Sequence, residues 1–161
     1  GAVTVGTYDG ANIEIREAVG EDNFFLFGLR ENEIQEMRPT YNPRKIYEES
    51  EYIKRILNAI NSNLFCEKDS PSLFKPIFDE LLNRDYFFVL ADLEAFNNAM
   101  KEAEKAYLKQ DEWAKKAIYN VAKVGYFSSD RAVAEYADKI WHVKSVDSDD
   151  AFEPEQEAKS A

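Results

Sequence analysis

The feature that most constrains the fold is a strand, helix and strand pattern within the first 28 residues. Residues 2–8 are β-branched and mostly apolar, which is typical of a buried parallel strand. Residues 11–19 have the apolar spacing of a short helix that Gly20 ends, and the apolar run 24–27 closes at Gly28. Two strands joined by a crossing helix pair in parallel. The sequence therefore predicts an α/β fold.

Beyond Gly28 the apolar spacing becomes helical, so we expect a helix-rich domain with few strands. The expected helical stretches are residues 34–37, 46–64, 71–82, 93–107, 113–121 and 128–140. Ser70 and Asp92 are placed to cap the helices that follow them, and Gly125 to end the fifth stretch. The apolar run 86–90 predicts one more short buried strand. No internal repeat is visible.

Composition excludes several classes of protein. Hydrophobic residues make up 45% of the 161 residues and aromatic residues 14%, too much for a disordered chain. The net charge is −11, so nucleic acid and anionic membrane surfaces are unfavourable partners. Residues 147–161 carry six acids and one lysine, which predicts a disordered acidic tail after a folded part at residues 1–146.

The ends of the chain and its cysteine content bear on its origin. Cys66 is the single cysteine, so no disulfide forms within the chain and a reducing compartment is expected. The sequence has neither an apolar run of membrane-spanning length nor a signal-peptide pattern. We expect a cytoplasmic protein, or a plastid one. Because Gly1 stands inside the first strand and is not Met, we also expect a longer parent chain.

Few residues are candidates for chemistry. His142 is the single histidine and adjoins the end of the last helix, where a surface role is commoner than catalysis. Cys66 has only Lys68 as a close basic neighbour, so an inert thiol is expected. Glu14 and Glu17 lie one helical turn apart. This spacing suits a pair of carboxylates for acid–base chemistry, but it more often belongs to an ordinary solvated helix face. We expect no metal site.

The turn at residues 7–12 is the most informative. Turns from strand to helix lie at the carboxyl edge of a parallel sheet, where ligands bind, and helix N-termini present free N–H groups. Asp9, Gly10 and Asn12 are its polar or flexible members. Yet Asp-Gly is a common turn pair, and no GxGxxG or Walker sequence follows. Residues 127–131 could form another site loop, although a double serine usually caps a helix. These residues alone reveal no activity.

The same segments carry a family resemblance. Residues 1–14, 21–28 and 127–131, with Tyr136 and the pair Ile140-Trp141, closely resemble the C-terminal end of the α-1,4-glucan phosphorylases, the glycogen and starch phosphorylases. Residues 73–75 and 89–92 are similar to further landmarks of this family, in the same order. The resemblance runs from Gly1 to about Val143 and leaves out the acidic tail.

This resemblance implies part of a GT-B enzyme that has two Rossmann-like domains and acts as a homodimer. Such enzymes use inorganic phosphate to remove glucose from the non-reducing end of glycogen, starch or maltodextrin, giving glucose 1-phosphate. Their pyridoxal 5′-phosphate is bound to a lysine in a Gly-Thr-Gly-Asn-Met-Lys motif, which the resemblance places just upstream of Gly1. The family's phosphate- and glucose-contacting residues also lie upstream.

The resemblance therefore implies no catalytic residue in this chain and no activity of the fragment alone. Asp9, Gly10 and Asn12 are then candidates for supporting the cofactor site without touching the cofactor. The helices within residues 127–141 would serve the hinge between the two domains.

A different class of function stays open. The helix-rich stretch after Gly28 and the charged residues after Asp147 could form a non-catalytic helical interaction module with an acidic docking tail. The upstream coding sequence discriminates between the two hypotheses. A long frame with the lysine motif supports the enzyme, and an initiator codon at Gly1 supports the module.

Overall fold

The computed structural model describes residues 2–66 and 72–144. The chain divides into two compact units, Gly1–Lys123 and Val124–Ala161. The described part is mostly helical with two short parallel strands, which gives it an α/β character. The expected acidic tail at 147–161, and Ser70 and Pro71 at the start of the third expected helical stretch, lie outside the described residues.

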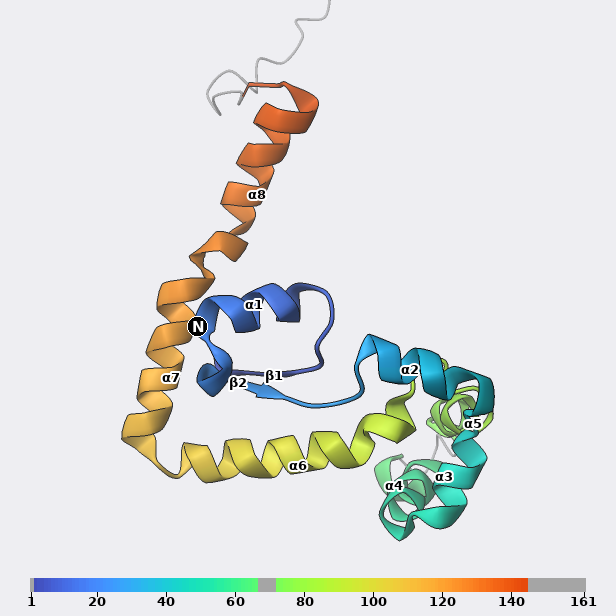
Figure 1. The fold of residues 1–161 in the computed structure, drawn as a ribbon. Helices are drawn as coiled ribbons and strands as arrows, with labels where there is room; N and C mark the ends of the chain where they lie inside the picture. The colour runs from blue at the N-terminus through green and yellow to red at the C-terminus, as the bar shows by residue number, and fades with distance from the viewer. Residues whose placement is uncertain (1, 67–71, 145–161) are drawn as a thin grey trace, which may run out of the picture. The chain divides into compact units, whose positions relative to one another are not determined.

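The first unit opens with the predicted strand, helix and strand. Strand β1 (Thr4–Gly6) pairs in parallel with β2 (Phe24–Leu26), and Thr4 faces Phe24 across the pair. Helix α1 (Ala11–Val19) connects them, followed by the short 3-10 turn η1 (Glu21–Asn23). In Figure 1 this blue segment forms a compact group. The predicted parallel pairing is confirmed, although each strand is shorter than expected.

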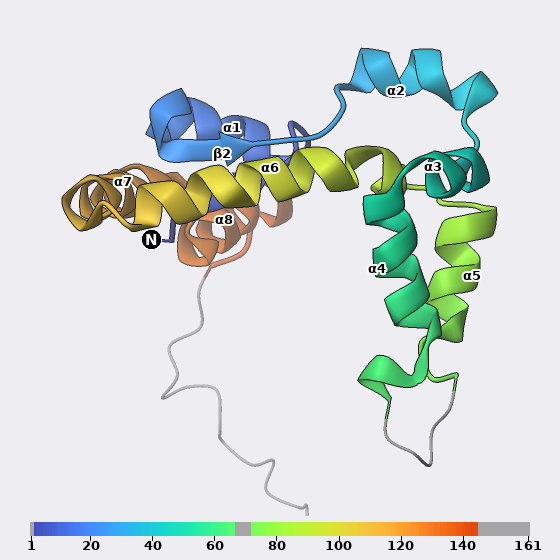
Figure 2. The ribbon, with the colours of Figure 1, turned by 90° about the horizontal axis from the view of Figure 1, so that it is seen from below.

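Six further helices complete the first unit in the described residues. They are α2 (Glu31–Met37), α3 (Pro43–Glu49), α4 (Glu51–Asn61), α5 (Lys75–Asn83), α6 (Val89–Tyr107) and α7 (Gln110–Lys123), with 3-10 turns η2 (Arg38–Thr40) and η3 (Asn63–Phe65). Helices α3, α4 and α5 pack together near the start of α6, and α6 continues past β2, as Figure 2 shows.

The centre of the helical group is a small apolar core. Ile53 and Leu57 of α4 and Leu90 of α6 are at most 2% exposed. The expected helical stretch 46–64 is divided at Ser50, because its hydroxyl accepts a hydrogen bond from the Ile53 N–H and starts a new helix. Ile46, Ile53, Leu57 and Ile60 nevertheless face one core, as their spacing predicted. Leu64 lies beyond the end of α4 and is exposed.

The predicted strand at 86–90 is wrong. These residues form a turn followed by the start of α6, and Phe88 has a left-handed φ of 59°. The Asp85 carboxylate decides this conformation, because it accepts hydrogen bonds from the N–H groups of Val89 (2.9 Å) and Leu90 (2.8 Å). A short apolar run does not distinguish a strand from a buried helix start.

Two expected helix starts also change. Asp92 is not a cap: it lies inside α6, whose first N–H groups are bound by Asp85. Helix α5 begins at Lys75, later than expected, after a turn in which Ser72 has a φ of 73°. That left-handed residue is incompatible with a continuous helix.

The second unit consists of short helical segments in its described part. Turn η4 (Val124–Phe127), which contains Gly125, leads to α8 (Ser129–Tyr136) and to a π-helical turn η5 (Ala137–Trp141). Ser128 is the N-cap residue, as predicted, yet its side chain makes no capping hydrogen bond. Arg131 instead pairs with Glu135 one turn later.

Candidate functional site

The turn after β1 brings the three sequence candidates together at the start of α1. The Thr7 hydroxyl donates to Oδ1 of Asp9 at 3.1 Å, and the N–H of Asn12 donates to the Asp9 carbonyl at 3.1 Å. Gly10 precedes the helix with φ 47° and ψ −138°, a combination that favours glycine. Asp9 and Gly10 are exposed. The turn therefore presents the Asp9 carboxylate to solvent.

Asn12 has a different environment. A Cβ placed on Gly6 would lie 2.7 Å from Nδ2 of Asn12 and 3.2 Å from the ring of Phe24. The Asn12 amide therefore lies directly against the backbone of β1. This contact holds α1 against the strand, so Asn12 stabilises the packing of the turn.

The loop after β2 is held by a residue from a distant part of the chain. Oδ1 of Asp92 in α6 accepts a hydrogen bond from the Leu29 N–H at 2.8 Å. Gly28 has a φ of +81°, and a Cβ there would lie 2.7 Å from Oδ2 of Asp92 and 3.0 Å from Cγ2 of Thr7. Gly28 therefore allows the two strand-end loops and α6 to approach closely.

The electrostatic environment of Asp92 is unfavourable to its charge. Partial burial raises the pKa of the Asp92 carboxyl above its usual value, and the nearby carboxylates of Asp85, Glu33 and Asp9 raise it further. The hydrogen bond from Leu29 acts in the opposite direction.

A hollow of about 590 Å³ lies where these loops meet α2 and α6, and we call it the strand-end hollow. Its polar lining includes the carboxylates of Asp9, Glu31 and Asp92, with Arg38 as a guanidinium. Tyr8 contributes an aromatic ring. Acids therefore outnumber bases in the hollow, which suits groups that donate hydrogen bonds better than it suits anions.

Two arginines support Tyr8 beside the hollow. The guanidinium carbon of Arg30 lies 4.2 Å from the centre of the Tyr8 ring, and that of Arg16 lies 5.7 Å from it. Arg16 also pairs with Glu21 at 2.9 Å. These cation–π contacts hold the Tyr8 ring in place.

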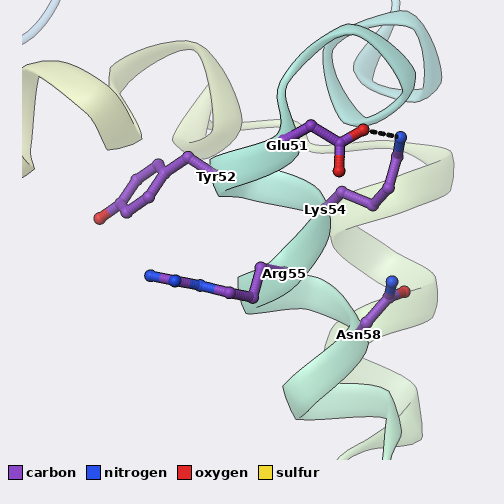
Figure 3. A pocket seen from close by; sticks show the side chains of 5 residues that line it. All are labelled: Glu51, Tyr52, Lys54, Arg55 and Asn58. Atoms are coloured by element: carbon purple, nitrogen blue, oxygen red, sulfur yellow. Dashed lines mark hydrogen bonds and ion pairs between the residues drawn. The ribbon is translucent and has the colours of Figure 1, made fainter.

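A second hollow, of about 570 Å³, lies on the surface of α4 (Figure 3). Its lining residues are Glu51, Tyr52, Lys54, Arg55 and Asn58. All five come from one helix, and Lys54 is already paired with Glu51 at 2.6 Å. In Figure 3 the Tyr52 and Arg55 side chains extend away from the helix. Since no other element contributes a lining group, the strand-end hollow is the better candidate site.

The other residues considered from the sequence lie elsewhere. Glu14 and Glu17 are exposed on α1, as expected for a solvated face, and Cys66 is half-buried. His142 is exposed in the second unit, and its Nδ1 lies 2.7 Å from the Asp138 carbonyl oxygen. Residues 2–66 and 72–144 contain no cluster of His, Cys, Asp and Glu that could hold a metal ion.

Asp92, Leu29 and Arg38 are site residues that sequence reasoning missed. The sequence predicts Asp92 as a helix cap, because an acid before a helical stretch is typical of one. Its actual partner is 63 residues away in the sequence, and no local pattern reveals such a contact.

The structure defines an α/β segment with polar side chains gathered at the carboxyl ends of two parallel strands, a usual place for ligand sites. Residues 1–143 match the carbohydrate phosphorylase family, and the chain belongs to this family.

Known relatives agree with this assignment. The chain is 49% identical over 144 residues to glycogen phosphorylase of Chlamydia trachomatis and 46% identical over 147 residues to that of Synechocystis. It is 41% identical over 148 residues to the brain form of the human enzyme. These matches cover 89–91% of this chain and 17–18% of the relatives. The chain therefore spans less than a fifth of their length.

Within the part of the chain that the structure describes, no helix is long and apolar enough to cross a membrane.

Proposed function

We propose that this chain is the C-terminal part of the catalytic domain of an α-1,4-glucan phosphorylase. The whole enzyme would transfer glucose from the non-reducing end of glycogen, starch or maltodextrin to inorganic phosphate, giving glucose 1-phosphate. The observation that carries this proposal is the 49% identity to a glycogen phosphorylase over 89% of the chain. The enzyme would be a cytoplasmic or plastid GT-B homodimer, and this chain alone would be inactive.

Pyridoxal 5′-phosphate would be attached outside this chain, to a lysine upstream of Gly1. The strand-end hollow does not fit the phosphate of this cofactor, because the carboxylates of Asp9, Glu31 and Asp92 outnumber the guanidinium of Arg38. The residues of this chain would therefore support the cofactor site without binding its phosphate.

The supporting role belongs to β1 and the turn that follows it. Asp9 and Gly10 would shape the end of the strand, and Asn12 would hold α1 on Gly6 through its close backbone contact. A strand anchored in this way gives the preceding residues a fixed exit from the sheet. Fixed geometry at a reacting centre lowers the entropic part of the barrier.

A chimera tests the proposal directly. Residues 1–143 would replace the matching segment of the Chlamydia trachomatis relative, and glucose 1-phosphate release from glycogen and phosphate would be measured together with cofactor absorbance. We expect release and bound cofactor. The control is the same relative truncated before the replaced segment, which should release no product.

A folded chimera with bound cofactor and no release would contradict the proposal. A chimera that neither binds cofactor nor releases product, while the isolated chain folds by itself, would favour the helical interaction module. The membership of residues 1–143 in the phosphorylase family makes the enzyme the stronger hypothesis.

A further inference from the structure

Resting on the function proposed above, we propose that Asp92 is a positioning residue for the phosphorylase reaction. From α6 it fixes the turn that carries Asp9, acting through the loop at Gly28 and Leu29 and through Thr7. Asp92 lies 83 positions after Asp9 in the sequence, so the connection exists only in the folded chain.

The first step of this connection is the contact of the Asp92 carboxylate with the loop after β2. Its Oδ1 accepts from the Leu29 N–H at 2.8 Å, a hydrogen bond strengthened when the carboxylate is ionised. Its Oδ2 lies against Gly28, where even a methyl group would come within 2.7 Å. One carboxylate thus holds two successive residues of the loop.

The second step passes from Gly28 to the turn after β1. The same position on Gly28 lies 3.0 Å from Cγ2 of Thr7, so the Thr7 methyl group packs against the face that Asp92 confines. The Phe27 N–H donates to the Gly6 carbonyl at 3.1 Å and continues the pairing of the strands up to this point.

The third step is the hydroxyl of Thr7, which donates to Oδ1 of Asp9 at 3.1 Å. The Asp9 side chain is otherwise exposed at the end of the turn. A continuous series of contacts therefore leads from α6 to the Asp9 carboxylate. A displacement of Asp92 reaches Asp9 only if the groups between them are closely packed. The short distances at Gly28 meet this condition.

The experiment uses the full-length enzyme that contains this chain, with Asp92→Ala, Asp92→Asn and Thr7→Val variants. Asp92→Asn keeps an oxygen that can accept from Leu29, whereas Asp92→Ala does not. Thr7→Val keeps the methyl contact with Gly28 and removes the hydroxyl that binds Asp9. Asp111→Asn, an exposed acid at the start of α7, is the matched control.

For glucose 1-phosphate release we expect Asp92→Ala and Thr7→Val each to lower kcat at least tenfold, with KM for the glucan changed less than threefold. Asp92→Asn should restore kcat to within threefold of the wild type, and Asp111→Asn should match it. The double variant Asp92→Ala with Thr7→Val should lose no more than the worse single variant, since both break one series of contacts. The proposal would be overturned if the two losses of kcat multiplied in the double variant, or if Asp92→Ala left kcat unchanged.

Amide hydrogen exchange provides a second test that does not depend on enzyme activity. In Asp92→Ala the segment 7–13 should exchange at least tenfold faster, while α4 keeps its protection. Faster exchange confined to residues 28–30, or in every segment alike, would show that Asp92 serves only its own loop or general stability. A wild type without product release would refute the proposed enzyme, and the exchange result would still decide the connection.

Discussion

At the scale of single residues, the buried Asp85 carboxylate joins separate segments of the first unit. It is 2% exposed and accepts hydrogen bonds from the N–H groups of Val89 and Leu90 and from the Tyr41 hydroxyl. Tyr41 in turn packs on Phe88, with ring centres 4.3 Å apart. One carboxylate therefore starts α6 and attaches the segment between α2 and α3 to it.

Replacing Asp85 by Ala should lower the free energy of unfolding by about 2–3 kcal/mol, because a helix cap is lost and the Tyr41 hydroxyl loses a buried partner. Urea denaturation of this chain measures the loss. The control Asp111→Ala, at an exposed position, should change it by no more than about 0.5 kcal/mol. Equal effects of the two substitutions would contradict the role given to Asp85.

Tyr41 should make stability depend on alkaline pH. Burial, together with the hydrogen bond to Asp85 and its charge, raises the pKa of Tyr41 above its usual value. A group whose folded pKa is raised contributes stability below its unfolded pKa, near 10.0, and loses it as the pH rises further. The free energy of unfolding, measured from pH 8 to 11, should therefore fall less steeply above pH 10 in Tyr41→Phe than in the wild type. Parallel curves would contradict this prediction.

At the scale of elements, α4 and α6 depend on one small core. Leu57 is 1% exposed, so Leu57→Ala should lower the free energy of unfolding by about 2–5 kcal/mol through lost burial and a residual cavity. The matched control is Leu108→Ala, at a side chain 81% exposed, with an expected change within about 0.5 kcal/mol. Chemical denaturation, followed by the circular dichroism signal of the helices, compares the free energies of unfolding of the two variants. A loss below about 1 kcal/mol at Leu57 would show that the core is not formed as described.

The packing of α1 on β1 depends on the missing side chain of Gly6. Gly6→Ala should displace the Asn12 amide and cost about 1–3 kcal/mol, because the new methyl group would lie 2.7 Å from Nδ2. Gly125→Ala is the matched control, since nothing lies within 4 Å of a Cβ there. Thermal unfolding of both variants tests the contact. Equal melting temperatures would show that Asn12 does not lie against the strand.

At the scale of the whole molecule, large apolar side chains are exposed in both units, among them Phe87 at 80% and Trp141 at 58%. Exposed apolar patches mark surfaces that contact other parts of a protein. On the proposed function, the rest of the phosphorylase would cover them, since the chain spans 17–18% of its relatives.

The isolated chain should therefore bind a hydrophobic dye such as anilinonaphthalene sulfonate more strongly than the chimera does at equal molar concentration. The measurement is dye fluorescence at neutral pH, with the intact relative as the reference. Equal fluorescence of the isolated chain and the reference would show that its apolar side chains are covered within the chain, and would support an independent module.

The sequence determined the elements whose signals are local. The β-branched opening, the helical spacing of residues 11–19 ended by Gly20, and the apolar run 24–27 were enough to predict the parallel pair, because each depends on neighbours in the chain. The order of the family segments was also enough to identify the carbohydrate phosphorylase family. The supporting roles of Asp9, Gly10 and Asn12 stay predictions.

Only the tertiary structure decided what depends on distant contacts. The sequence predicts a strand at residues 86–90 because their apolar side chains suit either state, whereas the buried Asp85 carboxylate starts α6 at Val89 after a turn at residues 86–88. Asp92 was expected to cap a helix, yet its carboxylate accepts a hydrogen bond from the Leu29 N–H, which lies near it only after β2 and α6 pack together. The physical reason is the same in both cases: a hydrogen-bonding side chain takes the partner that folding brings within reach, and a linear pattern does not record that partner.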